Sequence, residues 1–103
     1  MPQRPDPEAA RVAPARLPPR LPTTMLTRDT IEDEGIVSRA VLTGSLEGAH
    51  VRDVVFETIH FQRAVFRSFH LVAGHLRDVR FAHCDLTQAV FERLLAQRTE
   101  VLD

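Results

Sequence analysis

The residues able to bind a metal ion or act as a nucleophile lie in the second half of the chain. They are five histidines and the single cysteine: His50, His60, His70, His75, His83 and Cys84. Imidazole nitrogens and thiolates are common zinc ligands, and a deprotonated cysteine is a nucleophile. Structural zinc takes four ligands, however, and no carboxylate pair, Ser/His/Asp arrangement or glycine-rich phosphate loop accompanies these residues. We therefore expect no catalytic residue, no metal ligand and no cofactor, and predict that the chain is not an enzyme.

The elements that position these residues are defined by a row of large apolar side chains at every fifth position. The row comprises Leu46, Val51, Phe56, Phe61, Phe66, Leu71, Leu76, Phe81, Leu86 and Phe91, in a chain that is only 44% hydrophobic. Two residues before each member stands an uncharged and mostly small residue: Gly44, Ala49, Val54, Ile59, Ala64, Phe69, Gly74, Val79, Cys84 and Ala89. A helix repeats its apolar face about every 3.6 residues and a strand every second residue, so neither fits. The backbone must turn once in each repeat to return the fifth side chain inward.

The unit Cys84-Asp85-Leu86-Thr87-Gln88 resembles the ideal repeat of the pentapeptide-repeat proteins, which is a small residue, Asp or Asn, Leu or Phe, and two polar residues. The units that begin at Ala64 and Ala89 keep the same inward pair. The resemblance implies an all-β fold, a right-handed quadrilateral β-helix with four repeats in each coil. The sequence departs from the pattern at Ile59, Phe69 and Leu94, which are oversized for the small inward position, and histidine often replaces Asp or Asn.

With four repeats per coil, each residue lies beside the residue twenty positions later, about 4.8 Å away. This rule predicts four core columns: Leu46-Phe66-Leu86, Val51-Leu71-Phe91, Phe56-Leu76-Ala96 and Phe61-Phe81-Val101. On the outside it places Glu47 beside Arg67, and Glu57 beside Arg77. It also brings His50 beside His70, where two imidazoles could share a metal ion. Because no third ligand is evident, we interpret them as a solvated pair, and Cys84, in the inward position beside Ala64, as a packing thiol.

Three segments are expected along the chain. Residues 1–24 contain all seven prolines and are predicted to form a disordered arm rich in proline and arginine. This arm includes Arg16 to Pro22, which has the form of a proline-rich ligand but is more simply a linker, and Leu17 and Leu21 could cover the first coil. Residues 25–43 are expected to be a cap or an irregular first coil, in which Ile31, Ile36 and Val41 continue the register while Ala40 and Leu42 offer a competing one. Residues 44–103 form the solenoid, most regular over 44–93.

Composition narrows the class of protein. A chain of 103 residues with a net charge of −1 suits one small domain, and one cysteine allows no intrachain disulfide, as is typical of a reducing cytoplasm. The apolar runs are too short for a bilayer span or a signal peptide. All thirteen basic residues are arginine, which is typical of a GC-rich bacterial genome.

These features favour a non-catalytic scaffold or protein-interaction module whose partner is an unknown protein. Residues 44–103 carry seven Arg and eight Asp or Glu on all sides, so no basic stripe for direct nucleic-acid binding is present. The first alternative follows from the resemblance: some family members mimic DNA and bind gyrase or another topoisomerase, although they are longer and more acidic. The second alternative is a truncated fragment of a longer repeat protein. Since no cap is visible before Asp103, we expect the C-terminal coil to pair with a partner, as in a homodimer.

Overall fold

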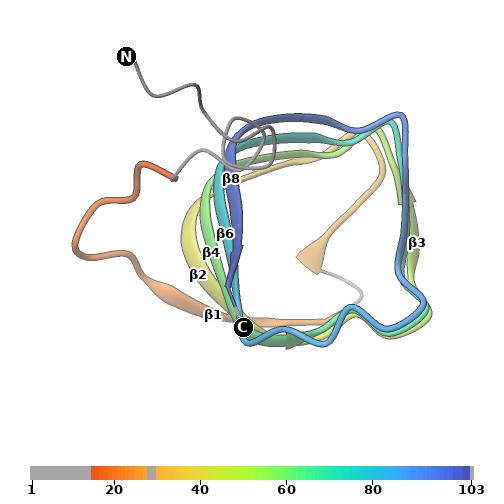
Figure 1. Ribbon diagram of the computed structural model, residues 1–103, viewed down its shortest axis with the longest axis horizontal. Helices are drawn as coiled ribbons and strands as arrows, with labels where there is room; N and C mark the ends of the chain where they lie inside the picture. Colours follow the sequence, from red (N-terminus) through yellow and green to blue (C-terminus); the bar gives the residue numbers. More distant parts are fainter. Residues whose placement is uncertain (1–14, 28–29, 103) are drawn as a thin grey trace, which may run out of the picture.

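The chain winds into a β-helix with a square outline, as a computed structural model that describes residues 15–27 and 30–102 shows (Figure 1). Eight strands make up nearly all of its regular structure: β1 (Thr23–Leu26), β2 (Ile36–Ser45), β3 (His50–Arg52), β4 (Val55–Val65), β5 (His70–Val72), β6 (His75–Ala82), β7 (Val90–Glu92) and β8 (Leu95–Leu102). The described residues contain no α-helix. The predicted all-β solenoid fold is confirmed.

Two parallel sheets form the walls of the β-helix. One has the order β1-β2-β4-β6-β8 and the other has the order β3-β5-β7. Each strand pairs with the equivalent strand of the next coil. The strands therefore stack along the axis of the β-helix, and each wall is made of the same segment from successive coils.

A left-handed backbone residue in every repeat turns the chain. From Asp53 to Arg98, every fifth residue has a φ between 50° and 59°. Thr58 and Arg63 are two of these residues, and both lie within β4, so this strand bends as it continues. L-amino acids other than glycine and asparagine rarely adopt this conformation. Its regular recurrence explains how a five-residue period, which suits neither helix nor flat strand, brings every fifth side chain back to the interior.

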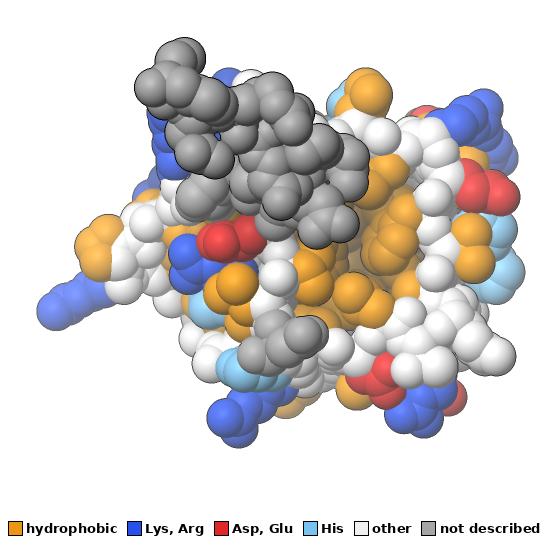
Figure 2. All heavy atoms as spheres, viewed as in Figure 1, with side chains coloured by type: hydrophobic (Ala, Val, Ile, Leu, Met, Phe, Trp, Pro, Cys, Tyr) orange, Lys and Arg blue, Asp and Glu red, His pale blue; other side chains and the backbone are white. Residues whose placement is uncertain are grey.

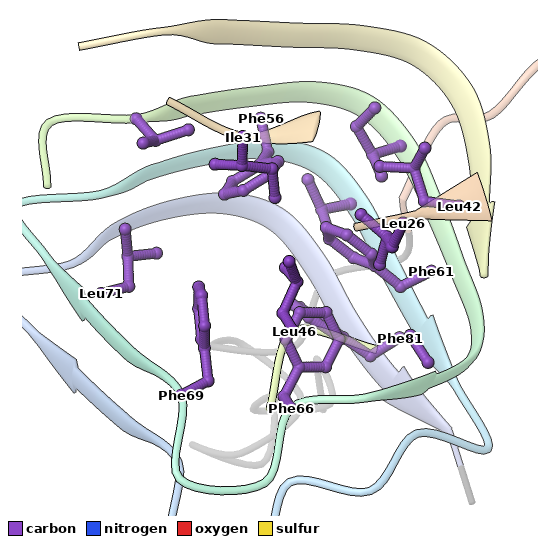
Figure 3. Close-up of a cluster of buried hydrophobic side chains, with 14 of the residues drawn as sticks. Leu26, Ile31, Leu42, Leu46, Phe56, Phe61, Phe66, Phe69, Leu71 and Phe81 are labelled. Carbon is purple, nitrogen blue, oxygen red and sulfur yellow. The ribbon is translucent and has the colours of Figure 1, made fainter. Parts of the chain in front are cut away.

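The interior consists of the predicted columns. The strand register places Val51 beside Leu71, Phe56 beside Leu76, and Phe61 beside Phe81. The rings of Phe61 and Phe81 stack with centroids 4.9 Å apart and planes inclined by 18°. Figure 3 shows Phe56, Phe61, Phe81 and Leu71 among the side chains that point into the enclosed space from several coils.

The oversized residues at small inward positions are accommodated. Ile59 and Phe69 are fully buried, and Leu94 packs against the core. The Phe69 ring meets Phe66 edge-on at 5.3 Å and Phe91 at 6.0 Å, so it bridges two coils. These departures from the ideal repeat therefore enlarge the core without breaking the β-helix.

Within β2 the regular register is wrong and the competing one is right, whereas Ile31, before β2, is buried as the regular register predicts. Ile36, expected to point inward, is 72% exposed, whereas Ala40 and Leu42 are buried. Leu42 lies beside Phe61, nineteen residues later, but Ser45 lies beside Val65, twenty residues later, so β2 has one residue fewer than β4 between Leu42 and Gly44. This single missing residue shifts the inward positions of β2 before Gly44 by one.

The first coil begins earlier than the predicted boundary at residue 25. β1 starts at Thr23 and pairs with β2, and both Leu26 and Ile31 are buried in the core. For residues 15–24 the structure thus differs from the predicted disordered arm: Thr23 and Thr24 lie in a strand, and residues 15–22, though not in a strand, contact the solenoid. The rest of the arm, residues 1–14, lies outside the described residues. At the other end β8 continues to Leu102, within the predicted solenoid of 44–103.

Candidate interaction surface

The end of the β-helix formed by β7 and β8 is open. Val101 continues the column of Phe61 and Phe81, but it is 53% exposed because no described residue stacks on its other side. At the opposite end Leu26 and Ile31 are only 2% and 3% exposed. The apolar interior is therefore closed at the β1 end and accessible at the β8 end.

A hollow of about 160 Å³ occupies the middle of this open end. Apolar side chains and one threonine line it: Leu76, Phe81, Leu86, Phe91, Leu94, Ala96, Thr99 and Val101. Figure 2, which views this end, shows hydrophobic side chains in the centre with white backbone and other side chains around them. An apolar hollow of this kind is a place where a protein side chain can be buried from water.

The backbone rim of the open end is a free strand edge. Among the described residues, β8 pairs only with β6, and β7 pairs only with β5. The edges therefore present backbone N–H and C=O groups that can pair with another strand.

The charged side chains of β8 are not free to block the pairing of another strand with this edge, because they are hydrogen-bonded to the preceding coil. Arg98 donates from Nε to Oδ1 of Asp78 at 2.6 Å and from Nη2 to Oδ2 at 2.9 Å. Arg80 donates from Nε to Oε1 of Glu100 at 2.6 Å. The hydrogen bonds from Arg98 are the main reason that the pKa of the buried Asp78 carboxyl lies below its usual value. Natural sheets commonly use exposed charges to block such edges, and β8 lacks this protection.

The histidine pair lies on the outside of the three-stranded wall. His50 and His70 are neighbours in register, as predicted, with ring centroids 5.3 Å apart. Nε2 of His70 is 3.2 Å from Oε2 of Glu92 in the next coil. In the part of the chain that the structure describes, no three His, Cys, Asp or Glu side chains are grouped so that they could hold a metal ion.

Cys84 lies half-buried at the edge of the core. Its Sγ is 3.5 Å from the carbonyl oxygens of Phe61 and Ala82, and it packs against the apolar cluster. Burial raises the pKa of the thiol, which disfavours the thiolate needed for nucleophilic attack. This placement agrees with the packing role expected from the small inward position.

Two outer-wall charge pairs, Glu47 with Arg67 and Glu57 with Arg77, follow the twenty-residue rule, whereas Arg67 and Asp85 are eighteen positions apart. Arg67 lies 3.9 Å from Glu47 and, on its other side, donates from Nη2 to Oδ2 of Asp85 at 2.7 Å. Hydrogen bonds from the Thr87 hydroxyl and backbone, followed by the one from Arg67, lower the pKa of Asp85 to about 2. Glu57 and Arg77 are neighbours in register, as predicted. Acidic and basic side chains thus alternate along the coils.

The Arg98–Asp78 and Arg80–Glu100 pairs obey the same rule, since each joins residues twenty positions apart. The sequence contained the signal that would have identified them. No equivalent signal existed for the contacts of residues 15–22, because this segment lies outside the repeat.

Comparison with known proteins adds no assignment to this geometry. No protein-family model matches the sequence, and no curated protein matches it. Over the described residues, none of the secondary structure is a helix of the length and apolarity needed to cross a bilayer. The function must therefore be argued from the surface itself.

Proposed function

We propose that the chain is a pentapeptide-repeat protein that acts as a non-catalytic interaction module in the bacterial cytoplasm, and that its open β8 end binds a second copy of the chain. The observation that carries this proposal is the apolar hollow at the β8 end, next to two unpaired strand edges. Packing two such ends together removes both hollows from water and gives each edge a partner.

The charges and dimensions of the end suit a two-fold pair. Both charged residues of β8 are already paired with the preceding coil, Arg98 with Asp78 and Glu100 with Arg80, so two identical β8 edges bring together no unbalanced charge from this strand. If the end is a disc with the 30 Å width of the molecule, its area is about 700 Å², close to the roughly 800 Å² per partner of a stable interface. A two-fold contact is also the commonest symmetry of soluble homo-oligomers.

No observation on the described residues favours the DNA-mimic alternative over this proposal. The outer acids Asp78, Asp85 and Glu100 are each bonded to an arginine. Support for a mimic would require a wall of unpaired acids.

Size-exclusion chromatography with light scattering tests the proposal. The wild-type chain is expected to elute with twice the 11.6 kDa mass of one chain. Val101→Lys places a charge beside the hollow and is expected to give monomers, because an unpaired ammonium is costly to bury. Met25→Lys is the matched control, because Met25 is also an exposed apolar residue but lies on β1 at the opposite end.

A wild-type monomer at every concentration would refute the proposed pair, and equal loss of the dimer in both variants would show that the β8 end is not the interface. Polydisperse aggregation of the wild-type chain would support the fragment alternative.

A further inference from the structure

Residues 15–22, here called the strap, cross the outer face of the five-stranded sheet. At the start of the strap Ala15 is buried, and the backbone N–H of Arg16 donates to Oδ1 of Asp78 on β6 at 3.1 Å. At its end the N–H of Val41 on β2 donates to the carbonyl oxygen of Pro22 at 2.8 Å. The strap is therefore fastened at both ends, and its centre spans β4 between them.

The centre of the strap lies over a cleft of about 310 Å³. Leu17, Pro18 and Leu21 line it from the strap, and Val41, His60 and Arg80 line it from the sheet. The side chains that the strap contributes, including Leu17, Pro18 and Leu21, are all apolar. None of them can accept a hydrogen bond from a protonated imidazole.

His60 is poorly placed to carry a proton under the strap. Its Nε2 is buried and has no hydrogen-bond partner. In register, its neighbours are Val41 on β2, which does not titrate, and the cationic Arg80 on β6. Glu100 on β8 is an acid whose charge acts on His60, but it already accepts a hydrogen bond from Arg80. The strap's own Arg16 and Arg20 are exposed and do not line the cleft.

We propose that the strap is a pH-sensitive device, closed over β4 while His60 is neutral and released when His60 gains a proton. A protonated His60 needs water or an acid, and release of the strap supplies water. Release also frees the proline- and arginine-rich segment from Arg16 to Pro22 and uncovers the sheet face beneath it.

The direction of the pH effect follows from the proton balance. Burial is the largest cause that lowers the pKa of His60 in the closed form, followed by Arg80, while Glu100 opposes them. Arg80 and Glu100 lie on the sheet and act in both forms, so the difference between the forms comes from the burial that the strap adds. The closed form therefore binds fewer protons than the open form, and acid favours opening. Closure is most favourable above the pKa that His60 has in the open form. Below that value the ratio of open to closed rises by up to about tenfold per pH unit, until the pH reaches the lowered pKa of the closed form. The anchor Asp78 stays ionised throughout this range, because its own pKa is lowered.

Tryptophan fluorescence can follow the strap directly, because the chain contains no Trp and no Tyr. In a Leu21→Trp variant the emission is expected to shift to the red as the pH falls from about 8 to about 5, while the far-UV circular dichroism of the solenoid stays unchanged. Adding His60→Gln should abolish the shift. Adding His75→Gln, which removes an exposed histidine on β6, should leave it intact.

A second readout uses the wild-type chain and does not depend on the reporter. Trypsin cleavage after Arg16 and Arg20 should become faster at pH 5.5 than at pH 7.5, relative to cleavage of the strap sequence as a free peptide. His60→Gln should remove that difference.

Constant emission and constant relative cleavage across this range would overturn the proposal, as would a transition that persists in His60→Gln or that coincides with loss of the β-sheet signal. The inference is independent of the proposed dimer, because both readouts can be repeated in the Val101→Lys background.

Discussion

Replacing Phe61 by alanine tests the column arrangement of the core at its centre. Phe61 is 1% exposed, and its ring lies 5.3 Å from Phe56, 5.0 Å from Phe66 and 4.9 Å from Phe81. The substitution therefore removes contacts within one coil and between two coils. No neighbouring side chain can fill the space, since those around it are themselves packed in the columns.

The expected loss is large for a domain of this size. Truncation of a buried Phe to Ala costs about 3–5 kcal/mol, out of a typical total stability of about 5–15 kcal/mol. For a domain of about 100 residues, this corresponds to a decrease in melting temperature of about 12 °C or more, or to a chain that does not fold. Val90→Ala on β7 is the control: Val90 is 44% exposed, and its truncation should change stability by no more than about 0.5 kcal/mol.

Thermal unfolding followed by circular dichroism, in the Val101→Lys background to separate folding from association, measures both variants. An unchanged melting temperature for Phe61→Ala, or a decrease no larger than that of Val90→Ala, would refute the column map. If Phe61→Ala does not fold, the milder Phe61→Leu and Phe81→Leu variants and their combination give a coupling energy. The stacked pair should couple by about 0.5–1.5 kcal/mol, and zero coupling would contradict the stacking.

Three further outcomes follow from local geometry. Gly44→Ala should destabilise the chain by more than about 1 kcal/mol in chemical denaturation, because Gly44 has a φ of 123° and an added Cβ would lie 2.7 Å from the carbonyl oxygen of Leu26. Thr58→Asn should stabilise the chain by about 1 kcal/mol in the same assay, because a β-branched residue with a φ of 59° is strained and asparagine tolerates this conformation. The Asp85 carboxyl should titrate near pH 2 by NMR, and Thr87→Val should move its midpoint toward 3.8. Because the folded-state pKa is the lower one, the stability contributed by Asp85 is present above pH 3.8 and is lost as the pH falls through about 2.

The core could be predicted wherever the repeat is regular. Phe61 over Phe81 followed from counting, because one large residue per repeat leaves a single way to fill each inward position. Prediction failed at Ile36, since one missing residue between Leu42 and Gly44 shifts the earlier inward positions of β2 and leaves both registers plausible from hydrophobicity alone.

The sequence predicted part of the β8 end but not the contacts of the strap. The place of Val101 could be predicted, because it continues the column of Phe61 and Phe81 by the twenty-residue rule. The contact of Arg16 with Asp78 joins residues 62 positions apart without any periodic relation, so no pattern in the chain could indicate it. The buried, unpartnered Nε2 of His60 likewise appears only in three dimensions.

The constant spacing of twenty residues between β4, β6 and β8 makes the length of this protein change in whole steps. An insertion of twenty residues adds one coil, which lengthens the β-helix by about 4.8 Å. Every later side chain keeps its inward or outward position on the same wall. An insertion of five residues instead rotates all later residues by one wall, so that Phe81 would leave Phe61 and face a different column. Natural or engineered variants of this fold should therefore differ in length by multiples of one full coil. The one-residue irregularity between Leu42 and Gly44 is an exception, and there the backbone of Gly44 adopts a positive φ.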